Sequence, residues 1–118
     1  MEYPTLEGNR ATFVRETCNG REDMEPGLQR WHAATLWVLD KPMHGRRGKL
    51  SRYVLLSYSR IQYIPEPNGP FRDLVNETMA FVADEHGNVL DWTELGCIRD
   101  EDATDGSLLE ELGCEVAR

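Results

Sequence analysis

The segment from Leu50 to Ile64 constrains the fold of this chain most strongly, because apolar residues recur on both of its alternating faces. The two sets are Val54, Leu56 and Tyr58 on one face, and Tyr53, Leu55, Ile61 and Tyr63 on the other. Side chains of a β-strand point to opposite faces in turn, so a strand that is apolar on both faces belongs in the middle of a sheet. We therefore expect a β-sheet with this strand in a central position.

Shorter strands are expected on either side of this segment, because runs of β-forming residues alternate with turn residues along the chain. The expected strands are Arg10–Thr17, Ala33–Leu39, Asn76–Ala83 and Val89–Trp92. The charged stretch 21–27 contains Pro26, which predicts a loop, and a turn of helix is expected at Leu28–His32. Asp84 and Gly87 predict a tight hairpin turn between the last two strands.

A short helix is expected near the C-terminus. Ser107 and Glu110 fit a capping box, and Gly113 fits the position just past a helix end. The apolar stripe consists of Leu108, Leu109 and Leu112. The sum is an α+β fold, an antiparallel four- to five-stranded sheet with a short C-terminal helix on one face. At 118 residues the chain fits a single domain, 1–118, with 1–9 as a loose lead-in.

Composition restricts the cellular context. No apolar run approaches the roughly 20 residues of a membrane span, and the N-terminus lacks the pattern of a signal peptide. These features predict a cytoplasmic protein without a membrane partner. The three cysteines, Cys18, Cys97 and Cys114, show no CxxC spacing. An odd number of cysteines without this motif favours reduced thiols over a disulfide framework or a structural zinc site.

Charge is unevenly distributed along the chain, which has a net charge of −8. Residues 1–60 carry a net charge of +3 and residues 61–118 a net charge of −11. A basic loop lies in the first half and contains Lys41, Arg46, Arg47, Lys49 and Arg52. With two glycines it could bind nucleic acid or an acidic protein surface, although no aromatic residue is interleaved in it to stack on bases. The alternative is a solvated hairpin loop.

The acidic counterpart lies in the C-terminal segment and consists of Asp100, Glu101, Asp102, Asp105, Glu110 and Glu111. Spaced carboxylates can occupy the phosphate-binding groove of a partner protein, because they mimic the charge of nucleic acid. A calcium loop is not expected, because the position that requires glycine is occupied by Asp105. A solvated acidic face is the alternative interpretation.

Catalytic and cofactor sites are not expected. The histidines, His32, His44 and His86, are far apart in the sequence, and none has the spacing of a helical metal site. His86 lies beside Asp84 and Glu85 in the predicted turn. A general base also needs an orienting partner and a substrate pocket, and neither is visible in the sequence. We expect no enzyme, no cofactor and no metal.

The segment 76–95, which reads NETMAFVADEHGNVLDWTEL, resembles small uncharacterised proteins of bacteriophage and prophage genomes. The resemblance covers roughly residues 50–116. In those proteins a strand and a loop lead into an "ETM-F" strand, and a short helix ending in "LGYE" sometimes follows. Here Leu112, Gly113, Cys114 and Glu115 stand in that place, with Cys114 where Tyr is usual.

The resemblance implies a viral protein that acts in the cytoplasm of a bacterial host. Small acidic phage proteins of this kind often bind a host protein stoichiometrically and inhibit or redirect it, as anti-defence and anti-CRISPR proteins do. The implied partner is a host protein, with a nucleic-acid-binding defence complex as one form. Two alternatives stay open: nucleic-acid binding through the basic loop, and a homo-oligomeric structural protein or homodimer that pairs through a sheet edge.

Overall fold

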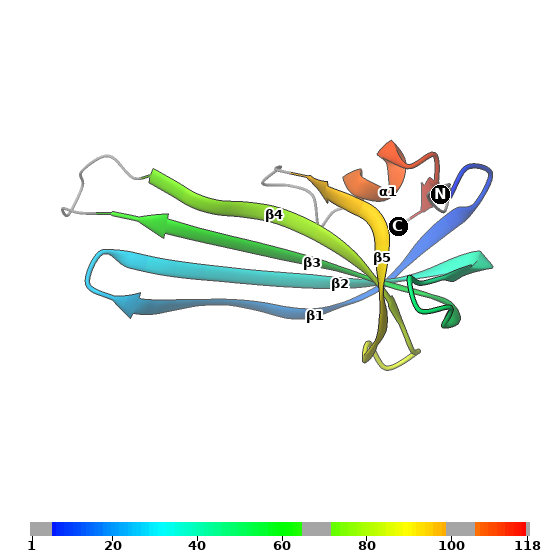
Figure 1. Ribbon diagram of the computed structural model, residues 1–118, viewed down its shortest axis with the longest axis horizontal. Helices are drawn as coiled ribbons and strands as arrows, with labels where there is room; N and C mark the ends of the chain where they lie inside the picture. The colour runs from blue at the N-terminus through cyan, green and yellow to red at the C-terminus, as the bar shows by residue number, and fades with distance from the viewer. Residues whose placement is uncertain (1–5, 65–71, 99–105, 118) are drawn as a thin grey trace.

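A curled six-stranded sheet makes up most of the chain, and one short helix packs against it (Figure 1). The computed structural model describes residues 6–64, 72–98 and 106–117, of which 73–76 and 94–98 are described by their backbone alone. The sheet is elongated, with principal extents of 48 × 28 × 27 Å. The helix lies at one end of it, and the β1–β2 hairpin extends to the other.

The strands follow one another in the sheet almost in chain order, as β5-β4-β3-β2-β1-β6. Their bounds are β1 Arg10–Glu25, β2 Leu28–His44, β3 Leu50–Tyr63, β4 Arg72–Ala83, β5 Val89–Ile98 and β6 Glu115–Ala117. The helix α1 spans Ser107–Glu111. Strands β1 to β5 pair antiparallel, whereas β6 pairs parallel with β1. The expected central strand is β3, which lies between β2 and β4.

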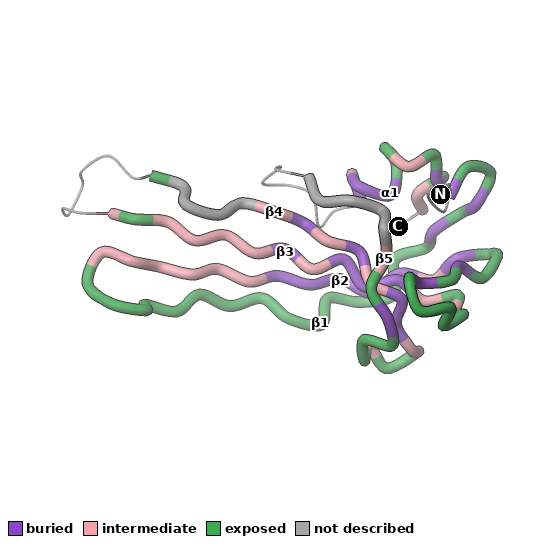
Figure 2. The backbone as a smooth tube through the Cα atoms, viewed as in Figure 1, coloured by how far each residue is buried: buried purple, intermediate pink, exposed green. Residues whose placement is uncertain are grey.

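The predicted α+β class with four or five antiparallel strands is wrong. The structure is mostly β, with 71% of residues in strands and 6% in helix, and its six-stranded sheet is mixed. One reason is the segment 21–32, where a loop and a helical turn were expected. There β1 and β2 form one long hairpin, in which Glu22 lies opposite Arg30 and Gly27 turns with φ 83°. Polar residues are tolerated in β1 because it is exposed from Thr12 onward (Figure 2).

The C-terminal segment forms the expected helix, but its first turn differs from the prediction. Gly106 is the N-cap, in the left-handed conformation, and no side chain caps the helix, so the predicted capping box is wrong. Gly113 follows the helix with φ 94°, as predicted. The chain then enters β6, whose register places Val116 beside Ala11 of β1. This parallel pairing makes the sheet mixed.

The main core lies between α1 and one face of the sheet. Trp37 is its largest side chain and is 1% exposed, and its indole Nε1 donates to Thr35 Oγ1 at 2.8 Å. Phe13 meets the Trp37 ring edge to face at 5.3 Å between centroids. The other members are buried apolar residues: Leu6, Ala11, Leu39, Met43, Val54, Leu56, Ala80, Val82, Leu108, Leu109 and Cys114. The short helix is therefore stabilised by its buried leucines rather than by its length.

A second, smaller cluster lies on the opposite face of β2, β3 and β4. It consists of Ala34, Leu36, Leu55 and Ala83, with Tyr53 and Phe81 partly buried against it. On this side the β4–β5 turn reaches β1, because Arg15 Nη2 donates to the backbone oxygen of His86 at 2.7 Å. Strands β1 and β4 are not neighbours in the sheet, so this contact is a direct consequence of its curl.

Replacing Thr78 with Val is expected to stabilise the protein by about 1 kcal/mol. Thr78 is fully buried, and its Oγ1 has no hydrogen-bond partner among the described residues. The isosteric Val removes this unpaired hydroxyl without leaving a cavity. Chemical denaturation measures the change. Thr35→Val is the matched control and should destabilise, because Thr35 Oγ1 accepts from Trp37. A Thr78→Val variant less stable than wild type would contradict the prediction.

Candidate functional site

The turn between β2 and β3, residues 45–49, presents three cationic side chains of the basic loop. Its backbone is closed by two hydrogen bonds, from Gly45 N to Lys49 O at 2.9 Å and from Gly48 N to Gly45 O at 3.0 Å. The side chains of Arg46, Arg47 and Lys49 are exposed. We call residues 45–49 the basic turn.

The carboxylate of Asp91 fixes the basic turn to β5. Asp91 is 4% exposed, and its Oδ2 accepts from Arg47 N at 2.8 Å and from Lys49 N at 3.3 Å. Its Oδ1 accepts from Trp92 N at 2.9 Å. Gly45 is needed for this approach, since an added Cβ would lie 2.6 Å from Asp91. The backbone N–H groups of the turn therefore point at a buried anion, and its cationic side chains remain in solvent.

Trp92 adds an exposed aromatic surface beside these cations. Its side chain is 49% exposed, and the guanidinium carbon of Arg47 lies 5.7 Å from the ring centroid. The backbone oxygen of Trp92 accepts from Arg46 N at 2.9 Å, which holds the turn and the indole together. Two large apolar neighbours in the chain are also exposed, Leu50 at 64% and Leu90 at 44%. An aromatic ring beside an arginine side chain is typical of energetic anchors in binding sites.

The predicted basic residues separate into two groups in the structure. Arg46, Arg47 and Lys49 lie together in the basic turn, whereas Lys41 and Arg52 lie outside it. Arg52 is exposed and its Nε donates to Leu39 O at 2.8 Å. The backbone N–H of Lys41 donates to Asn9 Oδ1 at 3.1 Å, and its side chain is exposed.

Sequence reasoning missed the aromatic member of this site. It found no aromatic residue within the loop, because Trp92 lies far from the basic turn in the chain and reaches it only through the curl of the sheet. The available signal was the pair Asp91-Trp92, a carboxylate and an indole at the end of an expected strand. That pair carries no indication of what it contacts, so only the tertiary structure joins it to the arginines.

The predicted acidic surface lies mostly beyond the part of the chain that the structure describes. Asp100, Glu101, Asp102 and Asp105 fall in the segment 99–105, outside the described residues. Glu110 and Glu111 lie on α1 and are exposed. These two carboxylates are available to solvent on the outer side of the helix, away from its buried leucines.

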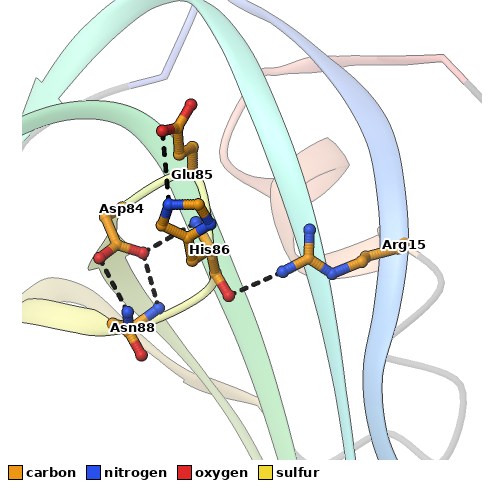
Figure 3. Close-up of polar contacts among 5 residues, drawn as sticks. All are labelled: Arg15, Asp84, Glu85, His86 and Asn88. Atoms are coloured by element: carbon orange, nitrogen blue, oxygen red, sulfur yellow. Dashed lines mark hydrogen bonds and ion pairs between the residues drawn. The ribbon is translucent and has the colours of Figure 1, made fainter.

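The His86 turn between β4 and β5 is built around a carboxylate (Figure 3). Asp84 Oδ1 accepts from His86 N and from Asn88 N, both at 2.9 Å, and Asp84 Oδ2 accepts from Asn88 Nδ2 at 3.0 Å. The imidazole Nε2 of His86 lies 3.5 Å from Glu85 Oε1, with both side chains exposed. Asp84 thus closes the turn through its own neighbours, and its oxygens serve a structural role.

The turn should loosen in acid. The Asn88 side-chain hydrogen bond is the main cause that lowers the pKa of Asp84 below its usual 3.8. A carboxylate with a lowered folded-state pKa stabilises the fold above the unfolded-state pKa, and this contribution disappears as pH falls through the folded-state pKa. The stability difference between wild type and Asp84→Ala should therefore be largest at neutral pH and shrink below about pH 3.8. Denaturation at neutral and acid pH measures it, and a constant difference would contradict this assignment.

Within the described ranges, no group of three or more His, Cys, Asp and Glu side chains is placed to hold a metal ion. No helix in the described part of the chain is long and apolar enough to cross a membrane.

Comparisons of the chain with protein-family models, with curated proteins and with solved structures found no match.

Proposed function

We propose that this protein acts by binding a bacterial host protein stoichiometrically, as the resemblance to small phage proteins implies. The observation that carries the proposal is the basic turn, which Asp91 and Trp92 hold on the end of the sheet. Anti-defence inhibitors, anti-CRISPR-like proteins among them, are the class that this resemblance implies. The proposed site of action is the cytoplasm of the host cell.

Rigid presentation supports this role. A binding loop loses less conformational entropy on association when its backbone is already fixed. Here the buried carboxylate of Asp91 accepts from two N–H groups of the turn, so its arginines start from an ordered backbone. Arginine and tryptophan are also the residues most enriched in interface hot spots. The partner surface that fits this site is acidic, with an apolar area for Trp92.

The acidic residues of the C-terminal segment provide a second proposed contact, toward a basic groove of the same partner. Their described members, Glu110 and Glu111, are exposed on α1. A nucleic-acid-binding defence complex presents such a groove. Reversing the charge of several acidic residues should then weaken binding and its salt dependence together.

Affinity capture from a bacterial lysate tests the basic turn. We expect a host protein that is retained at low salt by the wild type and is lost with Arg46→Glu plus Arg47→Glu. The matched control is Arg10→Glu plus Arg72→Glu, which changes the net charge equally at exposed positions elsewhere. If both double variants lose the captured protein, the loss is a general effect of net charge. Retention with the turn variant excludes the turn as the contact.

Nucleic acid is the second candidate ligand, and the position of Trp92 beside Arg47 favours it. Single-stranded nucleic acid binds to grooves that combine cations with an aromatic ring on which a base can stack. The expected result is a mobility shift of a single-stranded oligonucleotide that salt abolishes. Arg46→Ala plus Arg47→Ala should remove the shift, and Trp92→Ala should weaken it. A shift that survives the double substitution would place nucleic acid elsewhere on the protein.

A further inference from the structure

The outer edge of β1 is the longest unpaired strand edge in the described sheet. Strand β6 pairs with β1 only at Arg10, Ala11 and Thr12. Beyond Thr12 every residue of β1 is exposed, and no described strand lies on its outer side (Figure 2). Unpaired N–H and C=O groups on such an edge are a template for another strand.

The ladder with β2 determines which face of the sheet each side chain of β1 occupies. At three irregularities of that ladder a residue of β1 has no Cα partner in β2, and these residues are Val14, Thr17 and Met24. Glu16 lies opposite Thr35 and Arg21 opposite Trp31, so both occupy the face that carries the main core. Arg15 lies opposite Leu36 and Glu22 opposite Arg30, so both occupy the other face.

We propose that two copies of this chain pair through this edge, β1 against β1 and antiparallel, with the two-fold axis at Asn19. Residues directly opposite each other in an antiparallel pair share a face, so the axis must pass beside a single residue. We place Asn19 at the axis and leave the same three residues of β1 unpaired in the ladder between the two copies. In this register Glu16 lies opposite Arg21 of the second copy. Arg15 then meets Glu22 of the second copy.

Charge complementarity selects this register. The ladder contains five charged residues, and four of them, Arg15, Glu16, Arg21 and Glu22, meet an opposite charge, whereas Asp23 meets Phe13. The two-fold symmetry doubles both charge contacts. Moving the axis by one position, to Gly20, places Glu16 opposite Asp23 and opposes two negative charges. Among the described residues Glu16 and Arg21 form no ion pair within their own chain, so pairing supplies their partners.

Two of these side chains, those of Arg15 and Glu22, already make contacts within their own chain, and these contacts are compatible with pairing. Arg15 donates from Nη2 to His86 O at 2.7 Å, and its guanidinium has further N–H groups. Glu22 Oε1 lies 2.5 Å from Arg30 Nη2, and its carboxylate has a second oxygen. The length also fits, because the proposed ladder runs from Phe13 to Asp23, inside the limits set by β6 and by the β1–β2 turn.

This proposal concerns a different surface from the basic turn and does not depend on the proposed function. Its consequence is one continuous sheet through both copies, which would present two basic turns on a single particle. A bivalent particle binds a multivalent partner more tightly than one copy can.

Charge swaps test the register. Wild type should show a concentration-dependent dimer by analytical ultracentrifugation. Glu16→Arg alone, or Arg21→Glu alone, should raise the dimer dissociation constant at least about tenfold, because like charges then face each other. An equal mixture of the two single variants should dimerise again, and so should the double variant. These positions are exposed, so the variants should keep the monomer fold.

The matched control is Glu110→Arg or Arg72→Glu, which changes the net charge equally at exposed sites away from this edge. The control variants should dimerise like wild type. A wild type that stays monomeric at millimolar concentration would overturn the proposal. Single variants that dimerise as well as wild type, or a mixture that does not recover, would equally overturn this register.

Disulfide trapping provides an independent measurement. Opposite Cα atoms of an antiparallel pair are about 4.5–5.5 Å apart, within the range of disulfides. Asn19→Cys, in a chain that also carries Cys18→Ser, should cross-link to a dimer under mild oxidation. The control, Asp23→Cys in the same Cys18→Ser chain, should not, because Asp23 would lie opposite Phe13 of the second copy. Equal cross-linking of the two variants, or of neither, would overturn the assignment.

Discussion

Trp37→Ala is expected to lower the free energy of unfolding by about 4 kcal/mol, the largest effect of any single substitution considered for this chain. Trp37 is 1% exposed and lies at the centre of the core between α1 and the sheet. Its loss leaves a large cavity, because the surrounding β-sheet cannot collapse into the space. It also leaves Thr35 Oγ1 without the indole N–H that it accepts.

Trp92→Ala is the matched control, since it makes the same chemical change at a side chain that is 49% exposed. It should cost about 1 kcal/mol or less. Urea denaturation followed by circular dichroism, at one protein concentration, measures both variants. If the two substitutions had similar costs, Trp37 would not be the centre of the core.

Asp91→Ala is expected to destabilise by about 2–3 kcal/mol and to disorder the basic turn. The substitution removes the acceptor of three backbone N–H groups, those of Arg47, Lys49 and Trp92. Hydrogen bonds to a charged acceptor are among the stronger ones in proteins, and buried donors are costly to leave unpaired. Amide hydrogen exchange of the turn should accelerate by more than that of the sheet.

Asp40→Ala is the control for this substitution, because Asp40 is exposed and its loss should change stability by about 0.5 kcal/mol or less. Asp91→Asn should fall between wild type and Asp91→Ala, since an amide oxygen still accepts but carries no charge. Partner binding should be strongest for wild type, weaker for Asp91→Asn and weakest for Asp91→Ala, because the basic turn becomes more disordered in that order. This effect is expected even though Asp91 itself is buried. Unchanged exchange in the turn of Asp91→Ala would show that something other than Asp91 holds it.

Local patterns predicted the individual elements well where the pattern concerned burial or a turn. The alternation from Leu50 to Ile64 predicted a central strand, and β3, which spans Leu50–Tyr63, is one. Asp84 and Gly87 predicted the hairpin turn, and Gly87 has φ 88° there. The leucines at 108 and 109 predicted the buried side of α1.

Prediction failed where the pairing partner, and not the segment itself, decides the conformation. The polar segment 21–27 has neither apolar alternation nor strong strand formers, yet its residues 21–25 extend β1 because β2 lies beside them. The same holds for Leu28–His32, where a helical turn was expected and β2 begins. The fold class was wrong for this reason, since the long hairpin adds strand at the expense of loop and β6 pairs parallel with β1.

The sequence by itself determined the strand and turn positions in the middle of the chain, the buried leucines of the helix and the cations of the basic turn. Only the tertiary structure decided what those cations lie beside and which edge of β1 stays open. Periodicity and turn chemistry act between near neighbours, so they can be read along the chain. The meeting of Asp91 and Trp92 with the turn, and of Arg15 with His86, depends on the curl of a whole sheet, which no single segment encodes.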